Sequence, residues 1–160
     1  IVINGTLLKA GVPMDSRFGG ILQMRKGQAL RFVELISYSG SSLDPSEVFI
    51  RGKMTSVRSA VTEGEGKILA NFREIPALCK PVAENTIARL REAGLKGLVL
   101  MGNPSEPLCE IPVGVNRVGM VLLGGLNPVA VAEEMGIHTE NQAMSTTMEF
   151  SRLRPVWEMG

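Results

Sequence analysis

The residues best suited to bind a ligand are four consecutive ones, Gly124, Gly125, Leu126 and Asn127, which a proline follows. They come after the apolar run 118–123, which has the pattern of a strand buried on both faces. The glycines permit a sharp turn, and Asn before Pro is typical of an N-cap and a first helical residue. Free backbone N–H groups at such a helix start can bind an anion, for example a carboxylate. An ordinary strand-to-helix turn has the same pattern and is the alternative, since the motif is neither a Walker loop nor GxGxxG.

Three cationic side chains could hold a second carboxylate, namely Arg51, Lys53 and Arg117. A guanidinium is planar and pairs with a carboxylate through two parallel hydrogen bonds. Arg51 and Lys53 come at the end of a predicted short helix, where the helix dipole alone also favours a cation. These residues favour a small-anion binding module over an enzyme.

Cys79 is the candidate nucleophile of the chain. It lies beside Lys80 near a predicted helix start, and both features would favour a reactive thiolate. A small buried residue before a helix has the same pattern. Cys109 lies in a predicted loop, and the single histidine, His138, follows a predicted helix. Because no Ser/His/Asp, HExxH or metal-ligand spacing is present, we assign no catalytic residue, no metal site and no cofactor.

The composition indicates one domain, residues 1–160, that associates with itself. The chain is 44% hydrophobic with mean hydropathy +0.15 and nine Met, and excess apolar surface of this kind often covers a partner. A dense monomer core is the alternative. A net charge of +1 and 4% aromatic residues do not fit a nucleic-acid surface.

The setting predicted from the sequence is cytoplasmic. Two cysteines do not make a disulfide framework, and the longest apolar run is too short to span a bilayer, so we expect no membrane partner. Ile1 in place of Met indicates a processed chain or an excised domain.

The elements that would position these residues begin with three predicted strands, at 1–9, 19–25 and 29–38, in an antiparallel meander. Asp44 and Pro45 then begin a short helix that ends at Arg51 or Gly52. Two strand–helix–strand units follow. The first has strands at 67–73 and 98–101 around a helix that starts near Cys79 and Lys80 and is stopped by Gly94, and the second has strands at 118–123 and 144–150 around a helix stopped by Gly136.

We therefore predict an α+β (or α/β) fold with helices packed on a mixed, largely antiparallel sheet. Residues 102–116 contain three prolines and two glycines and are predicted to form a loop. The tail 152–160 is expected to dock on its own domain or on a partner.

The order of several segments resembles the regulatory domain of the archaeal nitrogen repressor NrpR family. The segments that carry the resemblance are GTLLKAGVP (5–13), RFGGIL (17–22), ALRFVELISYSGSSLDPSEVFI (29–50), ILANFREIPA (68–77), VGMVLLGGLNPVAVAEE (118–134) and AMST (143–146). Their order matters more than any one of them, and the resemblance covers nearly the whole chain.

The resemblance implies the ligand-sensing and oligomerisation domain of a transcriptional repressor of nitrogen-assimilation genes, with 2-oxoglutarate as effector. It also implies a homodimer or a higher homo-oligomer, and contact with DNA through a winged-helix domain that this chain does not contain. From the residue types alone, with no site residue taken from the family, one carboxylate of the effector would bind at Gly125, Leu126 and Asn127, and the other would pair with Arg117, Arg51 or Lys53. The alternatives are a small-metabolite enzyme using Cys79 and a ligand-free dimerisation module.

Overall fold

The computed structural model describes residues 2–141, 147–155 and 158. The elements in chain order are α1 (Val2–Lys9), β1 (Asp15–Arg25), β2 (Gln28–Ser37), α2 (Pro45–Arg51), α3 (Val57–Thr62), β3 (Gly66–Pro76), the 3-10 helix η1 (Ala77–Cys79), α4 (Lys80–Glu92), β4 (Leu98–Pro104), β5 (Arg117–Leu123), α5 (Asn127–Glu134) and the 3-10 helix η2 (Phe150–Arg152).

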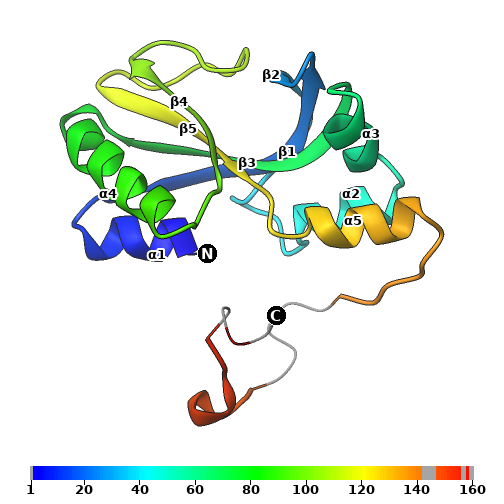
Figure 1. Cartoon of the computed structure of the whole chain (residues 1–160). Helices are drawn as coiled ribbons and strands as arrows, with labels where there is room; N and C mark the ends of the chain where they lie inside the picture. The colour runs from blue at the N-terminus through cyan, green and yellow to red at the C-terminus, as the bar shows by residue number, and fades with distance from the viewer. Residues whose placement is uncertain (1, 142–146, 156–157, 159–160) are drawn as a thin grey trace.

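The strands form one five-stranded sheet with the order β2-β1-β3-β5-β4, and every neighbouring pair in it is antiparallel. The helices lie in two groups on one side of the sheet, with α1 and α4 near one end and α2, α3 and α5 near the other (Figure 1). The predicted α+β fold is confirmed, and the sheet is antiparallel where the sequence suggested a mixed one. The two strands of the first predicted unit, β3 and β4, are separated by β5.

The apolar side chains of the core form two clusters. The larger one joins the first three strands to α2, α3 and α5, and its aromatic centre is formed by Phe18, Phe32 and Phe72. The Phe18 ring stacks on Phe72 at 5.2 Å and meets the edge of Phe32 at 4.9 Å. The smaller cluster includes Leu7 of α1, Ile75 of β3 and the α4 residues Ala83 and Ile87. Each fully buried apolar side chain of this size contributes about 1.5–3 kcal/mol relative to an exposed one.

The first predicted strand is wrong, because residues 2–9 form the helix α1. Ile3 and Leu7 are one helical turn apart, so they share a face, and Leu7 is fully buried against the smaller cluster. Gly11, with φ 81°, lies just past the helix end, where a left-handed residue commonly follows. The sequence therefore already contained apolar residues at the helical spacing of four. The β-branched residues at the start of the chain nevertheless favoured a strand.

Three further boundaries differ from the prediction. β1 begins at Asp15, four residues before the predicted start of the strand at residue 19, and the short helix α3 was not predicted. The strand predicted at 144–150 is also wrong in the part that is described, since 147–149 is not a strand and Phe150 begins η2. Residues 144–146 lie outside the described residues.

Other predicted boundaries are confirmed. Lys26 and Gly27 connect β1 to β2, and Gly94 and Gly136 follow α4 and α5 with φ of 79° and 82°. The side chain of Asp44 caps α2 by accepting a hydrogen bond from the Ser46 backbone at 2.8 Å.

Candidate functional site

The predicted ligand-binding turn exists, but its asparagine has a different role from the predicted one. Asn127 is the first residue of α5 and Leu126 is the N-cap. The Asn127 amide nitrogen donates to the backbone oxygens of Leu69 and Gly124 at 2.8 and 2.9 Å, and its oxygen accepts from the Leu69 backbone at 2.9 Å. With 6% exposure, the Asn127 side chain is engaged in fastening α5 to β3.

The two glycines of this turn are not equivalent. A Cβ at Gly124 would lie 2.7–2.9 Å from atoms of Leu69, including its backbone, whereas a Cβ at Gly125 would meet nothing within 4 Å. The close approach of the turn to β3 therefore requires glycine at position 124 and does not require it at position 125. The backbone N–H of Gly124 donates to Leu69 and that of Asn127 to Gly124. Those of Gly125 and Leu126 have no acceptor among the described residues and could bind a ligand.

The turn opens onto a mainly apolar groove. Its lining residues are Val57, Val61, Lys96, Gly97, Leu123, Gly124, Gly125, Asn127, Pro128 and Val131. Lys96, which the sequence analysis did not single out, is the cation of that lining. Anion binding at this turn remains a prediction that would depend on two backbone N–H groups and one lysine.

Arg117 lies at the opposite end of β5 from this turn. Gly124 comes seven positions after Arg117, and at about 3.4 Å per residue in an antiparallel strand this spacing spans roughly 20 Å or more. One small dicarboxylate cannot reach both places.

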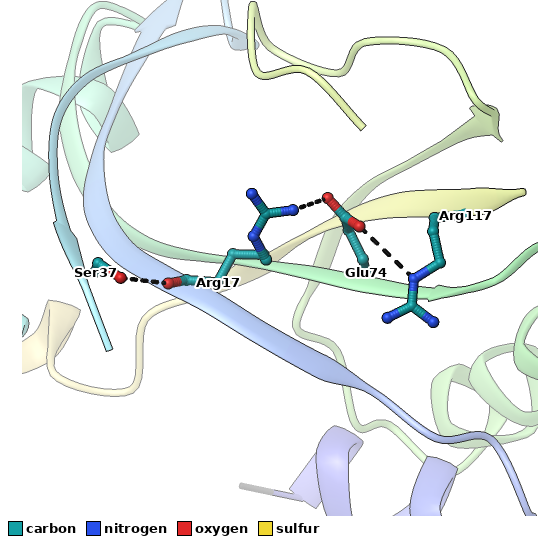
Figure 2. Close-up of polar contacts among 4 residues, drawn as sticks. All are labelled: Arg17, Ser37, Glu74 and Arg117. Atoms are coloured by element: carbon teal, nitrogen blue, oxygen red, sulfur yellow. Dashed lines mark hydrogen bonds and ion pairs between the residues drawn. The ribbon is translucent and has the colours of Figure 1, made fainter. Parts of the chain in front are cut away.

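Arg117 already has a carboxylate partner in Glu74. Its Nε lies 3.7 Å from Oε2 of Glu74, and Oε1 of Glu74 accepts a hydrogen bond from Arg17 (Figure 2). The Glu74 side chain is 3% exposed, so two arginines compensate one buried carboxylate. Figure 2 also shows that the Ser37 hydroxyl donates to the Arg17 backbone oxygen, at 3.5 Å. This cluster connects β1, β3 and β5. The charge of Arg117 is therefore explained by its pairing with Glu74, without a ligand.

Arg51 and Lys53 line a cleft of about 460 Å³ between the end of α2 and the segment after α5. Its lining residues are Glu47, Ile50, Arg51, Lys53, Glu133, His138, Thr139, Glu140 and Asn141. Two cations face three carboxylates there, which makes the cleft a poor place for a dianion.

Glu133 in this cleft is held in its charged form. Hydrogen bonds from the Thr139 backbone at 2.5 Å and from the Thr139 hydroxyl at 2.8 Å lower the pKa of Glu133, and the charges of His138 and Lys53 lower it further. The carboxylate thereby ties the 137–141 segment to α5.

Cys79 lies at the start of α4 and is half-buried. The neighbouring ammonium of Lys80 interacts with Asn103 at 3.2 Å and with Glu84 at 3.9 Å. Burial and the adjacent Glu110 raise the pKa of the Cys109 thiol, which keeps that thiol neutral. In the part of the chain that the structure describes, no group of three His, Cys, Asp or Glu side chains could hold a metal ion.

A polar cluster around Arg73 of β3 was not predicted from the sequence. Arg73 donates to the Ser16 hydroxyl, and its guanidinium carbon lies 5.8 Å from the centroid of the Tyr38 ring. The Tyr38 hydroxyl donates to the side-chain oxygen of Asn71. Burial lowers the pKa of Arg73 and raises that of Tyr38, and Asp44 also raises the Tyr38 pKa whereas Arg73 lowers it. The polar residues of β3 were visible in the sequence, but their partners, one in β1 and one directly after β2, were not.

The chain is similar to known proteins over nearly its whole length. Residues 1–155 match the family model described as NrpR regulatory domains NRD1 and 2. The chain is 36% identical over 156 residues to the Global nitrogen regulator NrpRI of Methanosarcina mazei, covering 98% of this chain and 48% of that protein. It is 32% identical over 159 residues to the Global nitrogen regulator NrpR of Methanocaldococcus jannaschii, covering 99% of this chain and 27% of the relative.

A solved structure has the same fold. The crystal structure of a nitrogen repressor-like protein from Methanococcus jannaschii superposes with a TM-score of 0.73 and 32% sequence identity, covering 89% of this chain and 59% of that one. The chain thus spans about half the length, or less, of the regulators it resembles. None of the helices in the described part of the chain has the length and apolar character needed to cross a membrane.

Proposed function

The chain belongs to the family of NrpR regulatory domains, and from this membership we propose that it is the effector-sensing and oligomerisation domain of a repressor of nitrogen-assimilation genes. The observation that carries the proposal is the match of residues 1–155 to the family, together with relatives that are named as global nitrogen regulators. Because the relatives are named as regulators, the comparison supports the expectation that the chain is not an enzyme. We propose a cytoplasmic location, which fits a repressor of genes.

The effector we propose is 2-oxoglutarate, a small dianion with a planar carboxylate at each end. Such a ligand is recognised by guanidinium groups and by aligned N–H donors. The net charge of +1 and the half-buried arginines of the sheet are compatible with it. Recognition of DNA belongs to a winged-helix domain outside this chain, and a homodimer would set the spacing of two such domains.

Effector binding would act by favouring one arrangement of the subunits over another. A ligand changes such an equilibrium only by as much as its affinity differs between the two states, so binding and regulation can be measured separately. The second requires the full-length repressor and its operator.

The direct test is a calorimetric titration of the purified chain with 2-oxoglutarate, with glutarate and succinate as controls. Saturable binding that is stronger for the keto acid than for both controls is the expected result. Heats no larger than dilution, at concentrations up to about 1 mM, where binding free energy is about 4 kcal/mol, would contradict sensing by this domain. Sedimentation of the same sample tests the proposed self-association, and a monomer at all concentrations would contradict it.

A further inference from the structure

We propose that Arg73, with Asn71, Tyr38 and Ser16, forms a binding site for a carboxylate-bearing small molecule on the helix-covered face of the sheet. The site is not among those predicted from the sequence. The inference rests on the proposed function for the identity of its physiological ligand, whereas the location of the site rests on the geometry alone.

The position of Arg73 in the fold is the first argument. Successive residues of a strand point to opposite faces, so Leu69, Asn71, Arg73 and Ile75 share one face of β3 and Glu74 lies on the other. Leu69 packs in the larger apolar cluster and Ile75 in the smaller one. Asn71 and Arg73 therefore lie between the two clusters, in the middle of the sheet and between the two groups of helices seen in Figure 1.

The charge of Arg73 is the second argument. Arg17 and Arg117 both pair with Glu74, but none of the described carboxylates forms an ion pair with Arg73. Its Nε is buried and has no hydrogen-bond acceptor among the described residues. A buried donor without a partner is unfavourable, and more so when it carries charge. A bound carboxylate would supply both the missing acceptor and the missing charge.

The neighbouring donors are the third argument. The hydroxyl of Tyr38 donates to the oxygen of Asn71, which orients the Asn71 amide and leaves its nitrogen without an acceptor among the described residues. Residues two apart on one strand face are about 7 Å apart, so this NH₂ and the Arg73 guanidinium can reach one small ligand. The Tyr38 ring beside the guanidinium restricts its orientation.

Asp44 does not neutralise this cluster. It acts on Tyr38 electrostatically, but it forms no ion pair with Arg73, and its Oδ1 is engaged by the Ser46 backbone N–H at the start of α2. The cluster therefore presents guanidinium, amide and hydroxyl donors toward a region without a paired acid. The cleft at Arg51 and Lys53, with three carboxylates in its lining, differs from it in this respect.

Ligand binding here would link three strands. Ser16 belongs to β1, Asn71 and Arg73 belong to β3, and Tyr38 follows β2 directly. A carboxylate held by these side chains would connect the start of β1 and the end of β2 to the centre of the sheet.

The test combines a spectroscopic measurement on the unaltered chain with binding to variants. In ¹⁵N-labelled chain, the side-chain N–H signals of Arg73 and Asn71 are followed during titration with 2-oxoglutarate, glutarate, succinate and inorganic phosphate. We expect saturable shifts of both signals with at least one carboxylate, and weaker effects of phosphate. Unchanged signals with every carboxylate would overturn the site, and equal response to phosphate would show a general anion site instead of a carboxylate site.

The variants Arg73→Lys and Asn71→Ala are compared with Arg25→Lys, a matched change at the exposed end of β1. Loss of a charge-assisted hydrogen bond is worth about 1.5 kcal/mol or more, so Arg73→Lys is expected to weaken carboxylate binding at least about tenfold. Arg25→Lys is expected to leave binding unchanged. A folded Arg73→Lys variant that binds as well as the unaltered chain would overturn the inference.

These results separate the inference from the proposed function. If glutarate shifts the Arg73 and Asn71 signals but 2-oxoglutarate does not bind, the site stands and the proposed effector fails. If 2-oxoglutarate binds and these signals stay constant, the effector stands and the site fails.

Discussion

Replacement of Asn127 by alanine tests the role that the structure gives to the strand-to-helix turn. The β3–β5 ladder ends at Ala70 and Leu123, and the Asn127 amide continues it by bonding the backbone of Leu69 in the next position. The side chain makes three hydrogen bonds of 2.8–2.9 Å in a buried position. At about 0.5–1.5 kcal/mol each, and with the Leu69 N–H left unpaired, the loss is about 2–4 kcal/mol of unfolding free energy.

Urea unfolding followed by circular dichroism measures this change, provided that the slope m is the same for both proteins. Asn103→Ala is the matched control, because its side chain bonds Lys80 and Glu106 on the surface and should change stability by less than about 0.5 kcal/mol. An Asn127→Ala protein with unaltered stability would refute the structural role. Loss of 2-oxoglutarate binding in such a stable variant would return Asn127 to the ligand site predicted from the sequence.

Three further predictions concern the glycines of the same turn and two other parts of the fold. Gly124→Ala should destabilise by about 1–3 kcal/mol because its Cβ meets Leu69 backbone, whereas Gly125→Ala should be neutral or slightly stabilising; equal melting temperatures would contradict this. Glu74→Ala should lower the unfolding free energy by about 2–4 kcal/mol by leaving two partly exposed arginines unpaired, and a change below about 1 kcal/mol in urea unfolding would contradict it. Thr139→Val removes a hydroxyl that donates to Glu133 and should raise the lowered pKa of that carboxyl group. The stabilisation from the carboxylate is present at neutral pH and is lost as pH falls through its folded-state pKa. An unchanged NMR titration curve of Glu133 in the variant would contradict this.

Local chemistry made part of the fold predictable. A glycine just past a helix can adopt positive φ without a Cβ clash, and Gly94 and Gly136 end α4 and α5 as predicted. The buried run of β5 and the hairpin of β1 and β2 were also readable, because their patterns are set by neighbouring residues.

Packing between distant segments was not readable in the same way. The segment 2–9 contains residues that suit a strand, and the contact of Leu7 with the smaller cluster decides for a helix. The order of the strands likewise depends on the position of β5 between β3 and β4. No local pattern of residues in the sequence predicts that position.

The candidate site was the least predictable part. Asn127 before Pro128 has the pattern of an N-cap, but the asparagine side chain finds better partners on β3. Arg117 looked available until Glu74 was placed beside it by the pairing of β3 with β5. Arg73 gave no signal in the sequence because its significance depends on its lacking an acid partner among the described residues, which is a property of the folded chain.

The most direct test of the central claim is the calorimetric titration of this chain with 2-oxoglutarate, run in parallel on Arg73→Lys. Saturable binding to the unaltered chain, selective over glutarate and succinate and weakened at least about tenfold in the variant, is the result expected from a sensor domain with its ligand at Arg73. Absence of binding to the unaltered chain would contradict the claim that this domain senses the effector.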